Sequence, residues 1–212
     1  MTTRAMGKGL GVTAAALTMA VGLAATANAA SDDSRGKWAA PAAVPAAASS
    51  VDYDAWLKDV REAVDKATPY VKQRAAKAKE EKQAIVLDID NTSLETHFHP
   101  LPPTPAIKPV LELVKYASAQ GVHIFFVSAR PGLINPVTKY NLKEAGYPVD
   151  GLYVRGVDDL FSSVADFKTA KRAEIEATGY KIIANIGNNT HDLVGGHAES
   201  TVKLPDYGGK LS

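Results

Sequence analysis

An apolar run that ends at two carboxylates limits the possible folds of this chain more than any other feature. Residues 84–87 read AIVL and lead directly to Asp88 and Asp90. A strand that is apolar on both faces is buried on both, which is typical of parallel strands in α/β proteins. Further strands of this kind are expected at 122–127, 151–155 and 181–186, with 201–204 as a candidate fifth strand.

Helical patterns alternate with these strands. Helices are expected over 54–66, over 69–81, from 104–109 to about 120, over 133–144 and over 166–178. Thr68 and Pro69 are expected to separate the first two helices, because proline interrupts the backbone hydrogen bonds of a helix. The alternation of strand and helix predicts an α/β fold, a doubly wound, mostly parallel sheet with helices on both faces.

Polar side chains follow three of the predicted strands at their carboxyl ends. These are Asp88 and Asp90, Ser128 and Arg130, and Asn188 and Asp192. Ligands of doubly wound sheets bind in the crevice beyond the carboxyl ends of the strands. We therefore expect these side chains to meet at one edge of the sheet and to form the functional site there.

The pair Asp88 and Asp90 has two interpretations when it is taken alone. An Asp-x-Asp sequence can simply cap a loop or form a solvated turn. Here the acids follow four buried apolar residues, and burial of two carboxylates is costly unless a cation neutralises them. Mg²⁺ is the natural partner of carboxylate oxygens, and a carboxylate held in this way can attack phosphorus while a second acid moves the proton.

An ordered set of short motifs carries a resemblance to a known family. The motifs are Asp88-Ile89-Asp90-Asn91-Thr92, Val127-Ser128-Ala129-Arg130, Asn141-Leu142 with Gly146-Tyr147, Lys168-Thr169 with Arg172, Gly179-Tyr180 with Ile182, Gly187 to Asp192, and Lys203-Leu204-Pro205. Together they resemble the haloacid dehalogenase superfamily, and within it the secreted acid phosphatases of class B and C and the plant vegetative storage protein group. The resemblance spans roughly residues 53–207.

The resemblance implies a role for each matching residue. Asp88 would be the nucleophile and a Mg²⁺ ligand, and Asp90 the general acid and base, with its main-chain carbonyl also on the metal. Ser128 would bind a phosphoryl oxygen, and Lys168 would neutralise charge on the nucleophile and the transferring group. Lys171 is a rival for the role of Lys168.

Two further matches leave alternatives open. Arg130 either lines the phosphate pocket or supports its loop. The fourth motif departs from the family pattern, because Asn188 stands where an aspartate usually binds the metal. Asn188 and Asp192 are the remaining predicted Mg²⁺ ligands, and the lost negative charge is expected to weaken metal binding.

The N-terminal residues have the pattern of a targeting signal and are not expected to be part of the fold. Arg4 and Lys8 precede an uncharged run, and Ala27-Asn28-Ala29 follows, so residues 1–29 are interpreted as a secretory signal peptide. A transmembrane anchor is the alternative. Residues 30–50 are rich in Ala, Pro and Ser and are predicted to be a disordered linker, and 51–212 the haloacid dehalogenase-like domain.

Composition excludes several other functions. The chain has no cysteine, so disulfides, cysteine nucleophiles and cysteine-bound metals are ruled out. Loss of residues 1–29 takes the formal net charge from +1 to −1, which is too balanced for nucleic-acid binding by bulk charge. No membrane contact is expected after cleavage.

These observations predict an exported Mg²⁺-dependent phosphomonoesterase that acts on small phosphomonoesters through an aspartyl-phosphate. No long insert follows Asp90 or precedes Lys168, so the cap is small or absent and the site is open. His97 and His99 are interpreted either as the pocket rim or as an exposed loop pair. The alternatives are a catalytically weak or inactive binding or storage protein on the same fold and a phospho-receiver domain, which export and Asp90 disfavour.

Overall fold

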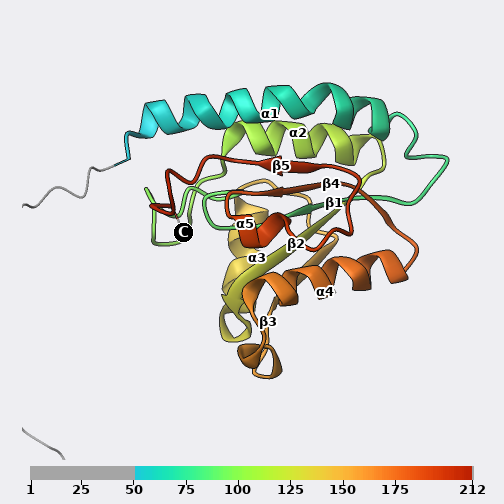
Figure 1. Cartoon of the computed structure of the whole chain (residues 1–212). Coiled ribbons are helices and arrows are strands. Elements are labelled where there is room, and N and C mark those ends of the chain that lie inside the picture. The colour runs from blue at the N-terminus through green and yellow to red at the C-terminus, as the bar shows by residue number, and fades with distance from the viewer. Residues whose placement is uncertain (1–50, 212) are drawn as a thin grey trace, which may run out of the picture. The chain divides into compact units, whose positions relative to one another are not determined.

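A five-stranded sheet in which every pair of neighbours is parallel is the centre of residues 51–211, the part of the chain that the computed structural model describes. The strands are β1 (Gln83–Leu87), β2 (His123–Pro131), β3 (Gly151–Arg155), β4 (Lys181–Gly187) and β5 (Thr201–Lys203), in the order β3-β2-β1-β4-β5. Figure 1 shows their arrangement. The predicted doubly wound α/β fold is confirmed. The predicted signal peptide 1–29 and linker 30–50 lie outside the described residues.

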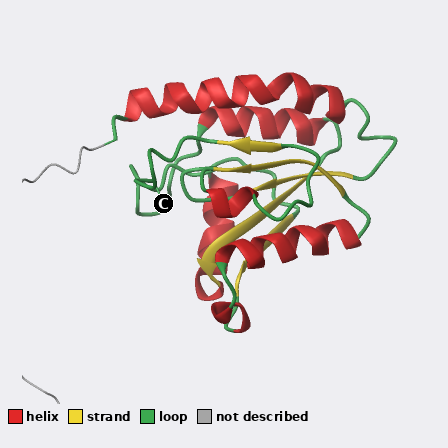
Figure 2. Ribbon diagram, in the orientation of Figure 1, coloured by secondary structure: helices red, strands yellow, loops and turns green. Residues whose placement is uncertain are grey.

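Helices cover both faces of the sheet. They are α1 (Tyr53–Ala75), α2 (Lys108–Ala119), α3 (Asn135–Glu144), α4 (Val164–Ala177) and the single-turn α5 (Thr190–Leu193), with short 3-10 helices η1 (Gly132–Ile134) and η2 (Asp158–Phe161). Figure 2 shows α1 and α2 together along one face and α4 along the other. The change of face between the connection before β2 and the connection before β4 is what makes the sheet doubly wound.

The alternation of side chains along β1 supplies both hydrophobic cores. Ile85 and Leu87 pack with buried residues of α1 and α2, whereas Val86 packs with Phe167 of α4 on the opposite face. All five residues of β1 are buried. This is why the strand reads as a continuous apolar run, as the sequence pattern predicted.

The prediction of two separate helices before β1 is wrong. A single helix, α1, continues through Pro69 to Ala75. Its apolar side, with Val64 before the proline and Val71 after it, is buried against the rest of the fold. Burial of that stripe on both sides of Pro69 outweighs the cost of about 3 kcal/mol for an interior proline, so packing overrides the local break.

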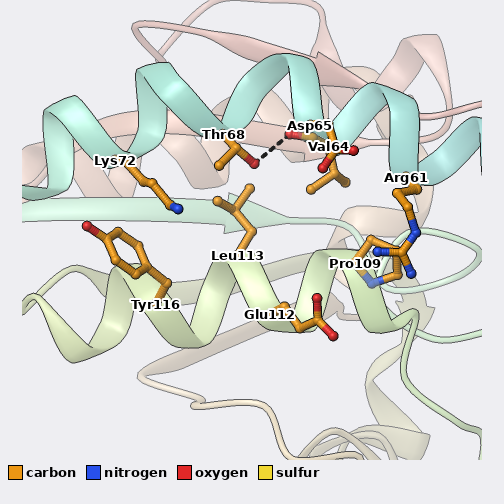
Figure 3. Close-up of a pocket in the computed structure, with 9 residues that line it drawn as sticks. All are labelled: Arg61, Val64, Asp65, Thr68, Lys72, Pro109, Glu112, Leu113 and Tyr116. Carbon is orange, nitrogen blue, oxygen red and sulfur yellow. Dashed lines mark hydrogen bonds between the residues drawn. The ribbon is translucent and has the colours of Figure 1, made fainter.

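A groove of about 210 Å³ lies between α1 and α2. Figure 3 shows Thr68 and Lys72 of α1 facing Leu113 and Tyr116 of α2 across it. The hydroxyl of Thr68 donates to the carbonyl of Val64 at 2.8 Å, one turn earlier. A hydroxyl that bonds back in this way bends a helix slightly, and here it lies next to the proline.

The connections at the carboxyl edge are short. Residues 88–107 join β1 to α2, and residues 156–163 join β3 to α4. Neither segment is long enough for a cap domain, in agreement with the expected open site. Within 51–211, no helix combines the length and the apolar character that a membrane span requires.

Candidate active site

A cavity of about 440 Å³ opens at the carboxyl edge of the sheet. It is lined by Asp88, Asp90, Asn91, Thr96, His97, Ala129, Val164, Lys168, Asn189 and His191. The segments after β1 and β4 meet here, where the strand order reverses direction. Ligands of doubly wound sheets bind at such a switch point, so the expected edge and the observed cavity coincide.

Asp88 lies at the inner end of this cavity and is almost completely buried, with 8% of its side chain exposed. Its main-chain N–H donates to the carbonyl of Ile186 in β4, and its own carbonyl accepts from Ser93 at 2.6 Å. These two bonds fix the backbone on which the carboxylate is carried. The main chain beneath the carboxylate is therefore anchored to β4 and to the loop after β1.

Lys168 joins two buried carboxylates. Its ammonium nitrogen lies 2.5 Å from Oδ1 of Asp88 and 2.5 Å from Oδ1 of Asp192, and 2% of the lysine side chain is exposed. α4 supplies the lysine, the end of β1 supplies Asp88, and α5 supplies Asp192. Lys171, the rival for this role, instead pairs with Glu174 at 2.9 Å on the exposed side of α4.

The charges of this cluster depend on burial and on one another. Burial raises the pKa of Asp88 to about 6, and Lys168 acts in the opposite direction. Burial also opposes the charge of Lys168, but Asp88 and Asp192 outweigh it and raise the pKa of the ammonium group. Lys168 is therefore positively charged at neutral pH.

Asp90 stands at the mouth of the cavity and is held by Arg130. The guanidinium donates to both carboxylate oxygens, from Nε at 3.0 Å and from the second terminal nitrogen at 2.7 Å, and 40% of the Asp90 side chain is exposed. Arg130 also donates to the hydroxyl of Thr138 at 3.3 Å. Arg130 thus supports the second acid, and its predicted contact with phosphate stays a prediction.

Ser128 lies beneath the cavity wall. Its hydroxyl accepts from the main-chain N–H of Arg130 at 3.2 Å, and the residue is buried. The pairing of β2 with β3 shifts register between Ser128 and Pro131, and Ala129 within this stretch lines the cavity. The role of Ser128 toward a phosphoryl oxygen stays a prediction.

Asn188 is buried and turned toward the end of the described chain. Its Nδ2 donates to the carbonyl of Leu211 at 2.8 Å, and its Oδ1 accepts from the hydroxyl of Thr92 at 3.2 Å. Its carbonyl accepts from Lys203 at 2.5 Å. The side chain that lines the cavity at this point is that of the next residue, Asn189.

Asp192 is fixed from several sides. Its Oδ2 accepts from the main-chain N–H of Asn189 in a capping box at the start of α5. Its carbonyl accepts from Arg172 at 2.8 Å and from Nδ2 of Asn185 at 2.9 Å. Arg172 and Asn185 are thus positioning residues that the sequence interpretation did not assign. The Lys168-Thr169-x-x-Arg172 string contained a signal for Arg172, and no motif marked Asn185.

The two histidines of the loop after β1 are in different places. His97 lines the cavity, and its main-chain N–H donates to Oδ1 of Asn91 at 2.7 Å. His99 lies 3.7 Å from Glu95, away from the cavity wall. His191 faces the cavity from the other side, and burial lowers its pKa. An isolated histidine carries no spacing signal, so the sequence assigns His191 no role.

The cavity wall carries side-chain oxygens that are suitable ligands for a cation. Asp88, Asp90, Asn91, Thr96 and Asn189 all carry side-chain oxygens, which suit a hard cation such as Mg²⁺. Within 51–211, no three His, Asp or Glu side chains converge as a preformed metal cluster. The donor set fits a cation that binds through few protein ligands, as Mg²⁺ usually does with its remaining positions filled by water and substrate.

Fold and site together define a member of the haloacid dehalogenase superfamily, as the sequence motifs indicated. The chain belongs to the acid phosphatase family described as HAD superfamily, subfamily IIIB (Acid phosphatase), whose model matches residues 10–99 and 103–210. The resemblance predicted from the motifs is confirmed.

Two curated plant proteins are similar to part of the chain. The Stem 28 kDa glycoprotein of Glycine max is 36% identical over 106 residues, which cover 48% of this chain and 42% of that protein. Acid phosphatase 1 of Solanum lycopersicum is 29% identical over 104 residues, covering 48% of this chain and 41% of that one. The aligned part therefore spans less than half the length of either relative.

A solved structure shares the fold. The class C acid phosphatase from Bacillus anthracis superimposes with a TM-score of 0.59 at 18% identity, covering 74% of this chain and 80% of that chain. At this identity the similarity concerns the arrangement of strands and helices. It agrees with the parallel sheet of Figure 1.

Proposed function

We propose that this protein is an exported, Mg²⁺-dependent phosphomonoesterase that acts through an aspartyl-phosphate on Asp88. The observation that carries the proposal is the buried cluster of Asp88, Lys168 and Asp192 beneath an open cavity with Asp90 at its mouth. A fixed nucleophile, a fixed cation and a second acid are the elements that phosphoryl transfer requires.

The first half of the reaction transfers the phosphoryl group to the protein. Oδ2 of Asp88, the oxygen that Lys168 does not hold, attacks phosphorus as the bond from phosphorus to the leaving oxygen breaks. Asp90 donates its proton to that oxygen, so the alcohol or phenol leaves neutral. Lys168 counters the negative charge on the nucleophile and on the phosphoryl oxygens throughout.

The second half releases phosphate. Asp90, now ionised, takes a proton from a water molecule, and the water oxygen attacks the phosphorus of the aspartyl-phosphate. The bond from phosphorus to Asp88 breaks, and the free carboxylate is restored. Arg130 steadies the Asp90 carboxylate between the two steps through its paired hydrogen bonds.

Mg²⁺, when bound, supplies further positive charge for the phosphoryl oxygens. Asp88 and Asp90 are the proposed ligands, with Asp90 acting through its main-chain carbonyl. Asn189 is a third oxygen donor on the cavity wall. The motif pattern also implied Asp192 and Asn188 as ligands, but the Asp192 carboxylate is bonded to Lys168 and to Asn189, and the Asn188 side chain is bonded to Leu211 and Thr92.

The substrate class follows from the shape of the cavity. The short connections after β1 and β3 leave the mouth open. An open mouth admits phosphomonoesters with leaving groups of different size, so broad selectivity is expected. Export is proposed from the signal-peptide pattern of residues 1–29.

Two measurements test this function. Release of phosphate from an aryl phosphate is followed with added Mg²⁺ and after chelation, and turnover should require the cation. Acid quench with phosphorus-labelled substrate should then trap label on the wild-type protein and none on Asp88→Asn. Turnover by Asp88→Asn equal to wild type would overturn the assignment of the nucleophile.

A binding protein without turnover is the second candidate. The observation that favours it is Asn188, which leaves the fourth motif with one carboxylate fewer than the family pattern. Such a protein would bind a phosphomonoester at the cavity and release no phosphate. Equilibrium binding of a phosphomonoester, measured beside the phosphate-release assay, separates the two candidates.

A further inference from the structure

The carbonyl oxygen of Leu211 accepts hydrogen bonds from two side-chain amides in the loops that form the active site. Nδ2 of Asn91 lies 2.9 Å from it and Nδ2 of Asn188 lies 2.8 Å from it. Asn91 follows Asp90 directly, and Asn188 follows the end of β4. One buried carbonyl therefore joins the two loops that meet at the switch point of the sheet.

The segment 206–211 also makes contacts of its own with the rest of the fold. The hydroxyl of Tyr207 donates to Oδ2 of Asp59 on α1 at 2.6 Å. Tyr207, Gly208 and Gly209 all have positive φ, at 51°, 69° and 85°, and they turn the chain back toward the site. The Leu211 side chain is fully buried in the same core as α1 and α2. Figure 1 shows this last segment at the carboxyl edge of the sheet.

The chemistry of the shared acceptor selects the residue type at position 188. A carbonyl oxygen only accepts hydrogen bonds, so both of its partners must be donors. An asparagine amide meets this requirement, whereas an aspartate carboxylate would place two acceptors against each other in a buried site. The departure of Asn188 from the family's aspartate is thus matched by a feature of this chain, the Leu211 carbonyl.

Asn91 connects the Leu211 carbonyl to the loop that carries Asp90. Its backbone is left-handed, with φ of 53°, and its Oδ1 accepts from the main-chain N–H of His97. Asn91 therefore links Asp90, the loop wall at His97 and the Leu211 carbonyl. Displacement of Leu211 would release both this residue and Asn188 at once.

We infer that residues 206–211 dock between the loops after β1 and β4, and that Asn188 is a positioning residue that receives Leu211 and not a ligand of the cation. Docking fixes the loop that carries Asp90 and the start of the loop that carries Asp192. The activity arm of the test rests on the proposed phosphatase function. The docking itself does not, because it is read from hydrogen exchange.

The test compares Asn188→Asp with Asn188→Ala in the full chain and in a chain that ends at Lys210. In the full chain, Asn188→Asp should speed hydrogen exchange in 206–211 and in 90–98 by about tenfold or more, with a smaller effect of Asn188→Ala. In the shortened chain the partner carbonyl is gone, so Asn188→Asp should change exchange in 90–98 by less than about twofold. Asn135→Asp, at the start of α3, controls for the added charge.

Activity supplies a second, separate reading. Asn188→Asp should lower kcat several-fold with a change in KM below about twofold, and the Mg²⁺ concentration for half-maximal turnover should not fall. Equal effects of Asn188→Asp on exchange in the two chain lengths would overturn the docking role. A several-fold lower Mg²⁺ requirement with unchanged exchange in 206–211 would instead place Asn188 on the cation. An inactive wild type would contradict the phosphatase function and leave the exchange test decisive.

Discussion

The ammonium group of Lys168 and the carboxylate of Asp88 form a buried ion pair at 2.5 Å between residues that are 80 positions apart in the chain. The pair joins α4 to the end of β1, on the face of the sheet opposite α1 and α2 (Figure 2). Because Asp192 shares the same lysine, one cation offsets two carboxylates. Fold stability and the proposed chemistry therefore depend on the same side chain.

Replacement of Lys168 by methionine should affect both properties. The variant leaves Asp88 and Asp192 buried without their cation, and loss of one partner of a buried pair costs about 3–5 kcal/mol. Turnover should fall by about 100-fold or more, because a fixed charge aimed at the phosphoryl group is lost. Urea unfolding and phosphate release measure the two effects.

Lys171→Met is the matched control for that variant. Lys171 lies one turn along α4 and pairs with Glu174 at a partly exposed position. Its loss should change the free energy of unfolding by less than about 1 kcal/mol and leave turnover near wild type. Equal losses in the two variants would show that the cluster at Lys168 has no special role.

Substitution of each of the two acids at the end of β1 should reduce turnover in a different way. Asp88→Asn removes the attacking oxygen, so turnover should fall to background for every substrate. Asp90→Asn keeps the nucleophile and removes the proton donor, so an alkyl phosphate should lose about 100-fold or more and an aryl phosphate less than about tenfold. Steady-state kinetics on one substrate of each type measures the difference. Equal losses on both substrates would argue against Asp90 as the acid.

Much of the fold could be predicted because its strands carry a strong local signal. β1 and β4 are buried on both faces, and each ends at polar residues that the same edge of the sheet brings together. The placement of Asp88 and Asp90 in the cavity follows from that topology, whereas Lys168, on α4, was indicated by the motif resemblance. A parallel sheet leaves few other places for residues that follow its strands.

Two features could not be predicted, and each has a physical reason. The continuation of α1 through Pro69 depends on packing against α2 and the sheet, which a local break signal does not contain. The bonds from Asn91 and Asn188 to Leu211 involve a main-chain carbonyl, which every residue has and which leaves no mark in the sequence. From the sequence alone, Asn188 is therefore interpreted only as the replacement of a charged metal ligand by a neutral one.

Replacement of Pro69 by alanine should stabilise the protein. Pro69 is exposed in the middle of α1, and an interior proline costs about 3 kcal/mol. The more flexible unfolded chain of the variant offsets about 1 kcal/mol of the gain. We expect the free energy of unfolding to increase by about 1–2 kcal/mol. Each kcal/mol should raise Tm by roughly 2–4 °C. Calorimetry measures it.

Pro136→Ala provides the comparison for that variant. Pro136 is also exposed, but it lies in the first turn of α3, where proline removes no helical hydrogen bond. Its replacement should leave Tm unchanged or slightly lower. A higher Tm for Pro136→Ala than for Pro69→Ala would contradict the account of α1.

Glu81 should make the stability of the fold depend on pH in the acid range. Hydrogen bonds from Gln83, Arg74 and Lys181 lower the pKa of Glu81 from 4.5 to about 2. The unfolded state therefore binds more protons between pH 4.5 and 2, and the stabilisation is complete above that window and lost as the pH falls through it. Glu81→Gln should lower the urea midpoint near pH 6 and approach wild type near pH 2, whereas Glu80→Gln should follow wild type at every pH. Parallel curves for wild type and Glu81→Gln across the window would show that these contacts do not stabilise the folded state.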